Sequence, residues 1–281
     1  MHILKVLLRS VIFAPQMLLL YLRGVPLRSL SEFEQYTSFF RHFPFASIDK
    51  NGIVSFRMGA HKVKMTCGEL HPRVLIGTFR KNDYGKLLGY ENIAGKDVVD
   101  VGAALGDTLV FFGLEGARSV YGYEIVESLY KLCEKNIALN GLEKVCHIEW
   151  CGIGGAEDYL STSHPAIGAF MLAEHRRTFN GVPLKSLRAI VKEHQIKDGI
   201  LKIDVDGLEY EIMAVADAET LRRFSHIVIE YHFGVKDIAT QLQKCGFKVS
   251  VTAPVQAYIN YHPEGYKDME VGYITAVRID L

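Results

Sequence analysis

One short segment, KDVVDVGAALGDT at Lys96–Thr108, constrains the fold of this chain more than any other. The valines of Val98–Val101 indicate a buried strand, which is followed by a glycine-containing turn and a helix that begins near Asp107. Gly102 and Gly106 allow the backbone of the turn to approach a ligand without an intervening Cβ atom. A strand that enters a helix in this way is typical of an α/β domain that binds its ligand at the carboxyl ends of the strands.

A carboxylate at the end of the next apolar strand indicates the class of ligand. The strand Ser119–Tyr123 is followed by Glu124, which a parallel sheet places near the first turn, where it can accept both hydroxyls of a ribose. Dinucleotide sites use G-x-G-x-x-G, whereas here Ala103 fills the middle position and the acidic Asp107 flanks the turn. Such a turn suits a cationic sulfonium better than a pyrophosphate, so the sequence favours S-adenosylmethionine as the cofactor.

The composition is that of a globular chain without a strong overall charge. Hydrophobic residues make up 49% of the 281 positions and charged residues 23%, which supports an apolar core and excludes wholesale disorder. Basic and acidic residues number 32 each, so no basic field favours nucleic acid as a partner. The cysteines show neither a C-x-x-C pair nor zinc-site spacing, and we interpret them as small apolar side chains in a reducing, cytoplasmic compartment. They are Cys67, Cys133, Cys146, Cys151 and Cys245.

Residues 1–90 are expected to form an extension in front of a domain at residues 91–281. The pattern of residues 1–45 is helical, with a cluster of aromatic side chains. Residues 52–66 alternate enough to predict an antiparallel hairpin. Residues 71–90 are predicted to be a connector that lies over the cofactor site.

The apolar segment Ile3–Leu22 raises the question of a membrane. A spanning helix needs about 20 nearly uninterrupted apolar residues, whereas Lys5, Arg9 and Pro15 interrupt this one. No small-residue cleavage site follows, so a signal peptide is not expected. We favour helices that pack on the domain or on a second copy of the chain, with peripheral contact of residues 3–22 with a membrane surface as the alternative.

From residue 97 onward, strands alternate with helical segments, which predicts a mostly parallel sheet. Helical periodicity runs over Glu127–Asn140 and stops at Gly141. Ala253–Met269 has no helical period, so the last two strands are expected to form an antiparallel hairpin at the sheet edge. Such a seven-stranded sheet is the arrangement of Rossmann-like methyltransferases. The predicted strands are Val98–Val101, Ser119–Tyr123, Val145–Trp150, Gly199–Ile203, Ile227–Tyr231, Phe247–Thr252 and Gly272–Ile279.

The segment LKIDVDGLEYEIM at Leu201–Met213 places a second set of acidic residues at a strand end. Asp204 and Asp206 follow the strand at its carboxyl end, where open α/β sheets bind ligands. Lys202 is costly to bury without a carboxylate partner. Glu209 opens the next helix and has a structural explanation in the helix dipole. We therefore expect a functional site here, with a Lys–Asp pair and a charged helix start as the alternative.

Four segments, VVDVGAALGDT, VYGYE, KIDVDGLEYEIM and IVIEYH, occur in an order and spacing that resemble the FkbM family of S-adenosylmethionine-dependent methyltransferases. The resemblance covers about residues 97–232 and implies an α/β, Rossmann-like class I methyltransferase fold. Asp206 stands where the family usually carries Glu. Leu187 is followed by Arg188 where the family often has Leu-Asp, so substrate contacts from this helix depart from the pattern.

The resemblance also implies which residues contact the cofactor. The methionine end is lined by the turn after the first strand, the ribose is held by Glu124, and the loop Trp150–Ile153 borders the adenine. The cofactor-binding residues expected on this basis are Asp100, Gly102, Ala103, Gly106, Asp107, Thr108, Glu124, Ile125, Cys151 and Gly152.

FkbM relatives methylate hydroxyls of sugars and natural products, which implies a hydroxyl on a sugar, glycan or other small metabolite as the acceptor. An alcohol needs a general base or a metal ion. Histidine titrates in the right range, so we rank His232 first as the base. Glu230 is a further candidate, and Asp204 with Asp206 holding Mg²⁺ is the alternative mechanism. No residues are assigned as metal ligands outside this alternative.

Two other function classes stay open at this point. One is a nucleotide-binding oxidoreductase, which the missing central glycine disfavours. The other is a membrane-bound scaffold that keeps the methyltransferase fold without activity.

Overall fold

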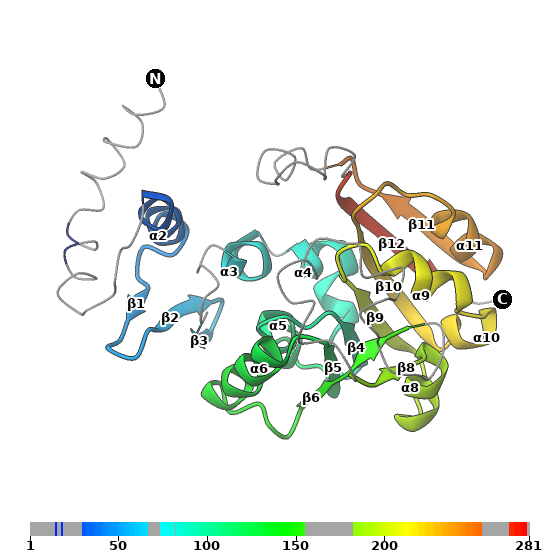
Figure 1. The fold of residues 1–281 in the computed structure, drawn as a ribbon, viewed down its shortest axis with the longest axis horizontal. Helices are drawn as coiled ribbons and strands as arrows, with labels where there is room; N and C mark the ends of the chain where they lie inside the picture. The colour runs from blue at the N-terminus through cyan, green and yellow to red at the C-terminus, as the bar shows by residue number, and fades with distance from the viewer. Residues whose placement is uncertain are drawn as a thin grey trace.

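A seven-stranded sheet with the strand order β11-β12-β10-β9-β4-β5-β6 forms the centre of the fold (Figure 1). The computed structural model describes residues 15, 18, 30–66, 74–81, 83–154, 182–254 and 270–279. β12 is antiparallel to both of its neighbours, and the other adjacent strands are parallel. The strands are β4 (Asp97–Val101), β5 (Ser119–Glu124), β6 (Cys146–Trp150), β9 (Gly199–Ile203), β10 (Phe224–Tyr231), β11 (Phe247–Val251) and β12 (Gly272–Arg278).

This topology confirms the predicted Rossmann-like methyltransferase fold and its terminal antiparallel hairpin. All seven predicted strands are present, and the largest difference in their ends is at β10, which begins at Phe224 instead of Ile227. The sequence pattern misses the first three residues of this strand because Ser225 and His226 interrupt the apolar run. The tertiary structure extends the strand because Phe224 pairs with Gly199 of β9.

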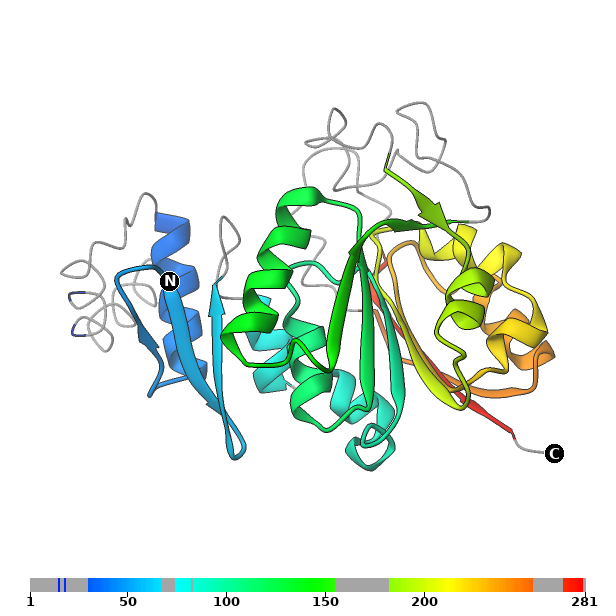
Figure 2. The same ribbon diagram turned by 90° about the horizontal axis from the view of Figure 1, so that it is seen from below.

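Two apolar cores lie on opposite faces of the sheet, because successive strand residues point to opposite sides. Val98 and Ile200 pack in one core, and Val99 and Leu201 pack in the other. β4 and β9 are buried along their whole length, as expected for central parallel strands. Figure 2 shows the helices in layers on the two sides of the sheet. One side carries α5 (Asp107–Leu114) and α6 (Glu127–Leu139), and the other carries α8 (Leu187–Glu193), α9 (Glu209–Val215), α10 (Ala218–Leu221) and α11 (Ile238–Lys244).

The N-terminal part contains the predicted hairpin, with one more short strand added. β2 (Ile53–Met58) and β3 (His61–Thr66) are antiparallel, and β1 (Ser47–Ile48) pairs with β2. The helix α2 (Leu30–His42) contributes Phe39 to an aromatic core that includes Phe56 of β2, with ring centroids 6.0 Å apart. Phe45, an aromatic residue of the segment 1–45, does not join this core: it is 96% exposed because it lies in the turn after α2.

Two asparagines, Asn136 in α6 and Asn140 directly after it, attach this N-terminal sheet to the rest of the protein. Asn136 is fully buried, accepts a hydrogen bond from the Thr66 amide at 2.7 Å and donates to the Thr66 carbonyl at 2.9 Å. Asn140 makes the same pair of bonds with the backbone of Lys64, at 2.9 Å and 2.7 Å. The amide side chains therefore act as hydrogen-bond partners for the open edge of β3.

The predicted connector consists of short helical turns that pack on the central sheet. They are α3 (Val74–Ile76), the π-helix η1 (Gly77–Lys81), α4 (Asp83–Leu88) and the 3-10 helix η2 (Tyr90–Asn92). Leu75, Phe79 and Leu88 are buried in the same core as α5. The division into an extension and a domain at residue 90 stays a prediction.

The described cysteines are free thiols, of which Cys245 is partly exposed, and most of the N-terminal segment lies outside the described residues. Cys133, Cys146 and Cys151 are buried free thiols. Of the segment 3–22, the structure describes only Pro15 and Leu18. None of the helices in the described ranges is long and apolar enough to cross a bilayer.

Candidate active site

The two motifs of the sequence meet at one edge of the sheet, because β4 lies between β5 and β9 and these strands are parallel. The turn after β4, the carboxylate that ends β5, and the acidic residues after β9 and β10 all leave the sheet on this side. Carboxyl ends of neighbouring strands at a change in strand order are the usual ligand site of open α/β sheets.

The glycines of the turn are required by the packing of the protein itself. Gly102 and Gly106 have φ values of 83° and 82°, which disfavour residues with a side chain. A Cβ atom on Gly102 would lie 1.8 Å from the carbonyl oxygen of Asp204, and one on Gly106 would lie 2.5 Å from Sγ of Cys133. Packing within the protein is therefore enough to explain why glycine occupies these two positions, and the predicted approach of a ligand is not required.

Lys202 has a buried carboxylate partner, as expected from the sequence. Its Nζ lies 2.8 Å from Oδ1 of Asp100 and donates a 2.6 Å hydrogen bond to the carbonyl of Gly102. The hydroxyl of Thr108 donates to the other carboxylate oxygen of Asp100 at 2.5 Å. Burial by itself lowers the pKa of Lys202, but Asp100 and Asp204 outweigh it and raise that pKa above its usual value.

Three of the residues expected to contact the cofactor are buried at the glycine turn. Asp100 and Ala103 have no exposed surface, and Thr108 is 4% exposed. Asp100 and Thr108 are bonded to each other, and Asp100 is also paired with Lys202. These residues fix the shape of the turn from below, and their contact with a cofactor stays a prediction.

Glu124 connects the glycine turn to the start of α6. Its carboxylate accepts hydrogen bonds from the backbone amides of Ala104 and Val126 at 2.7 Å and 2.8 Å. The side chain is buried, and burial raises its pKa to about 7. Asp107, at the start of α5, accepts a hydrogen bond from the hydroxyl of Thr78, and burial raises its pKa to about 6. Two carboxylates thus flank the turn, an arrangement that repels a pyrophosphate.

The remaining predicted cofactor contacts follow β5 and β6. The carbonyl of Ile125 accepts a 2.8 Å hydrogen bond from the indole of Trp150. Gly152 begins β7 (Gly152–Ile153), where a Cβ atom would meet Leu184 at 2.6 Å. Cys151 is 1% exposed, and its side chain belongs to one of the two apolar cores.

The ends of β9 and β10 bring together all four predicted catalytic residues. Nε2 of His232 lies 3.3 Å from Oδ1 of Asp206 and 3.8 Å from Oδ1 of Asp204. One atom each of Asp204, Glu230 and His232 lie within 4.8 Å of one another. Asp204 and Asp206 keep partial exposure, with side chains 29% and 36% accessible, whereas His232 and Glu230 are buried. We refer to these four residues as the acidic cluster.

Glu209 is the site residue that the sequence reasoning missed. It has no exposed surface, accepts from the His232 amide at 3.0 Å and contacts Nδ1 of the same histidine at 3.4 Å. Its other oxygen accepts from the amide of Gly207 at 2.8 Å. From the sequence, the helix dipole explains Glu209, but the dipole also favours exposed carboxylates and so does not account for the complete burial of this one. The clue was its position in KIDVDGLE, two residues after Gly207 of a turn in which Asp206 and Gly207 both have positive φ.

The environment of His232 is dominated by carboxylates, and its role as a general base stays a prediction. Burial by itself lowers its pKa, but contacts with Glu209, Asp204 and Asp206 outweigh burial and raise the pKa to about 10. Burial, with a contribution from Asp204, also raises the pKa of Glu230 to about 8.

The connector supplies a further side chain to the acidic cluster. The hydroxyl of Tyr84, on α4, donates to Oδ2 of Asp204 at 3.3 Å. The ring of Tyr84 also packs against Tyr273 of β12, with centroids 6.1 Å apart. Together with the bond from Thr78 to Asp107, these contacts place the connector against the predicted site.

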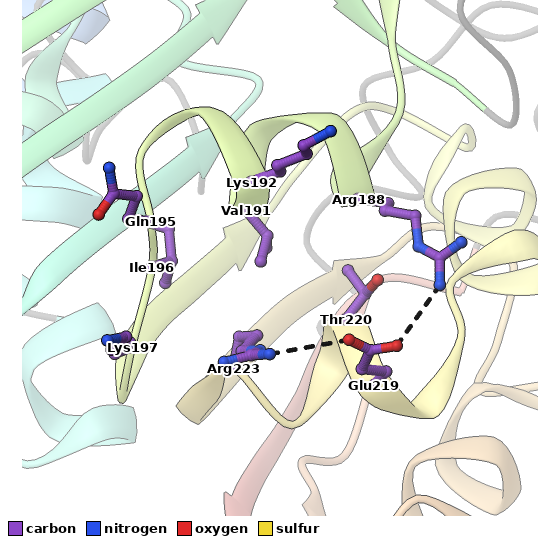
Figure 3. Close-up of a pocket in the computed structure, with 9 residues that line it drawn as sticks. All are labelled: Arg188, Val191, Lys192, Gln195, Ile196, Lys197, Glu219, Thr220 and Arg223. Atoms are coloured by element: carbon purple, nitrogen blue, oxygen red, sulfur yellow. Dashed lines mark ion pairs between the residues drawn. The ribbon is translucent and has the colours of Figure 1, made fainter.

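Arg188, where the sequence departs from the family pattern, faces a different cavity. Leu187 is buried, whereas Arg188 is exposed and pairs with Asp217 at 3.2 Å and Glu219 at 3.6 Å. Figure 3 shows this cavity of about 450 Å³ between α8 and α10, where Glu219 also pairs with Arg223. The cationic side chains around it are partly neutralised by these ion pairs, and Arg188 takes no part in the acidic cluster.

The site residues fit a cationic cofactor better than an anionic one. Asp107 and Glu124 flank the turn, and the acidic cluster lies next to it through the contact of Gly102 with Asp204. Carboxylates at these positions would repel phosphate groups and stabilise a positive charge. This donor set agrees with S-adenosylmethionine, whose sulfonium and amino groups are positive.

Comparison with known proteins yields one family match and distant structural similarities. No curated protein matches the chain significantly. The methyltransferase domain of METTL16 is 15% identical, covering 89% of this chain and 92% of its own, with a TM-score of 0.48. A putative RNA methyltransferase from Pyrococcus horikoshii is 12% identical, covering 72% of this chain and 85% of its own, with a TM-score of 0.41. Precorrin 8W decarboxylase from Methanobacterium thermoautotrophicum is 14% identical, covering 71% of this chain and 89% of its own, with a TM-score of 0.41.

These structural similarities are too remote to bear on the substrate. The family comparison is more specific, because the profile described as the methyltransferase FkbM domain matches residues 100–249. That range runs from the glycine turn through the acidic cluster to β11, and thus includes both sequence motifs. The chain therefore belongs to the FkbM family of methyltransferases.

Proposed function

We propose that this protein transfers a methyl group from S-adenosylmethionine to a hydroxyl group of a sugar, a glycan or another small metabolite. Membership of a methyltransferase family implies S-adenosylmethionine as the methyl donor. The observation that carries the choice of a hydroxyl acceptor is the acidic cluster beside the glycine turn. Methylation of an alcohol requires a group that takes its proton, and carboxylates can accept a hydrogen bond from a hydroxyl.

The role of each group follows from its accessibility. Glu124 and Asp107 would hold the cofactor, which supplies the methyl group when bound. Asp204 and Asp206 are the partly exposed carboxylates of the cluster, so they are the ones that can receive the hydroxyl of the acceptor. Lys202 and Glu209 are buried and hold the two strand ends in place. Positioning of the acceptor oxygen in line with the methyl group is then the main contribution of the fold.

Binding experiments test the choice of cofactor. Calorimetric titration with S-adenosylhomocysteine should give one binding event per chain, whereas NADH should give none. Binding of NADH in place of S-adenosylhomocysteine would favour the oxidoreductase that the sequence left open.

Transfer experiments test the choice of acceptor. Radiolabelled S-adenosylmethionine is incubated with the protein and with a panel of sugars and glycans, and with matched panels whose hydroxyls are blocked. Label should pass only to the free hydroxyls. Binding of S-adenosylhomocysteine without transfer to any hydroxyl panel would contradict the proposed acceptor class while leaving the cofactor assignment intact.

A further inference from the structure

The geometry points to a binding site for a divalent first-row transition-metal ion formed by Asp204, Glu230 and His232. The site itself is argued from the side chains alone. Its role in catalysis rests on the methyl transfer proposed above.

Neighbouring strand ends bring the three potential ligands together. Asp204 directly follows β9, while Glu230 and His232 are two positions apart on β10 and its continuation, so they point to the same side. Their ligand atoms lie within 4.8 Å of one another, and Nε2 of His232 is 3.8 Å from Oδ1 of Asp204. Ligands about 2.0–2.2 Å from one ion are at most about 4.4 Å apart, so only a small contraction is needed.

Each of the three side chains has a partner that fixes its orientation. Glu209 contacts Nδ1 of His232, so the opposite ring nitrogen points toward Asp204 and Asp206. Oδ2 of Asp204 accepts from the hydroxyl of Tyr84, which leaves Oδ1 facing the histidine. Glu230 has a hydrogen bond with Tyr273. Partners of this kind on the second atom of each ligand are a regular feature of metal sites.

An excess of carboxyl groups over cationic partners gives an independent reason for a cation. The carboxylates of Asp204, Asp206, Glu209 and Glu230 surround a single imidazole. Lys202 balances them only in part, because its ammonium group is paired with Asp100 at 2.8 Å and lies farther from Asp204, at 3.9 Å. A bound dication would satisfy this excess at the place where the ligand atoms converge.

The donor set selects the class of ion. Mg²⁺ prefers oxygen ligands, whereas an imidazole nitrogen with two carboxylates suits Mn²⁺, Fe²⁺, Co²⁺ or Zn²⁺. This site differs from the predicted Mg²⁺ site of Asp204 and Asp206. The potential ligand atoms that lie together are those of Asp204, Glu230 and His232. Asp206 contacts Nε2 of His232 and adds negative charge at the rim.

An ion at this position would act on the oxygen of the acceptor. Coordination withdraws electron density from that oxygen and lowers the pKa of the hydroxyl. The O–H bond breaks with its proton passing to water. The new O–C bond then forms as the S–C bond of the sulfonium breaks, which leaves neutral S-adenosylhomocysteine and the methyl ether.

Metal binding is measured without any cofactor or acceptor. Chelator-treated full-length protein is titrated with Mn²⁺ by calorimetry and followed by electron paramagnetic resonance. We expect one Mn²⁺ per chain, with Mg²⁺ at least tenfold weaker. Glu230→Gln and His232→Gln should each weaken Mn²⁺ binding at least tenfold, and Glu209→Gln by about 10–100-fold. Glu219→Gln, which removes an exposed carboxylate of the cavity in Figure 3, should bind Mn²⁺ like the wild type.

A second measurement on the wild type keeps the test decisive if a variant fails to fold. Spin-echo modulation from a directly bound ¹⁴N must accompany Mn²⁺ binding, since His232 is one of the ligands. Absence of stoichiometric Mn²⁺ binding, absence of the nitrogen signal, or equal affinity for Mg²⁺ would each overturn the site. Mn²⁺ binding without S-adenosylhomocysteine binding would contradict the proposed function alone, and the reverse result would contradict the metal site alone.

Discussion

The two halves of the candidate site are built on opposite principles. At the ends of β4 and β5, the polar side chains have partners within the protein. Asp100 forms an ion pair with Lys202 and accepts a hydrogen bond from Thr108, and Glu124 accepts from two backbone amides. At the ends of β9 and β10, the carboxylates outnumber their partners, and Asp204 and Asp206 stay partly exposed.

The difference indicates a division of labour between the strand ends. A network of paired groups holds one geometry because each group would be costly to leave unpaired. A cluster with more carboxyl groups than cationic partners is costly by itself, and a ligand or ion can reduce that cost. The first half is therefore suited to hold the turn in one shape, and the second to take part in chemistry.

The largest expected effect tests whether the glycine turn is fixed by the protein itself. Gly102→Ala should cost about 5 kcal/mol of unfolding free energy or prevent folding, because the new Cβ would meet the backbone of Asp204 at 1.8 Å. Gly141→Ala is the control, since it has a similar positive φ and no atom within 4 Å, and should cost about 1–2 kcal/mol. Urea unfolding measures both. Equal costs would mean that backbone conformation and not packing explains Gly102.

The next effect concerns the buried ion pair of the first half. Lys202→Met should cost about 3–5 kcal/mol of unfolding free energy, because Asp100 would keep a buried charge without its partner. The double variant with Asp100→Asn should recover much of this loss, as a double-mutant cycle would reveal. Lys185→Met, which breaks a more exposed pair with Glu149, should cost at most about 1 kcal/mol. Similar losses at both lysines would remove the distinction between the two environments.

A smaller effect tests whether the first half also holds the cofactor. Glu124→Ala should weaken S-adenosylhomocysteine binding by about 2–4 kcal/mol, through loss of charge-assisted hydrogen bonds to the ribose. Glu127→Ala, on the exposed first turn of α6, should leave the affinity unchanged. Calorimetry on variants shown to be folded by circular dichroism makes the comparison. Wild-type affinity in Glu124→Ala would exclude this residue as the ribose ligand.

The smallest effect is a pH dependence of the same binding. Glu124 has a pKa of about 7, raised by burial, and it would bind ribose hydroxyls as the carboxylate. The competent form is complete above that pKa and is lost as the pH falls, so affinity for S-adenosylhomocysteine should drop about tenfold from pH 8 to pH 6. Glu124→Gln should remove this dependence. A flat profile in the wild type would show that the carboxylate does not change its protonation on binding.

The sequence was sufficient for the sheet because its signals are local. Buried runs such as Val98–Val101 and the stop at Gly141 depend on residues that are adjacent in the chain, and both have the predicted structure. Lys202 was also predictable, because a buried ammonium requires a carboxylate whatever the fold. Its partner was named only as a nearby carboxylate, since pairing across β4 and β9 is a tertiary contact.

The roles of individual site residues depended on the tertiary structure. Patterns placed Asp100, Cys151 and His232 at strand ends, but they do not report which way a side chain points or what surrounds it. The fold buries Asp100 and Cys151, and it surrounds His232 with carboxylates from α9 and the turn after β9. The pKa of a side chain depends on all charged groups around it, and most of these groups are distant in the sequence. The sequence by itself therefore determined where the strands lie along the chain and which acidic residues follow them. The burial and pKa values of these side chains depend on the packing of β9, β10 and α9, which only the tertiary structure decided.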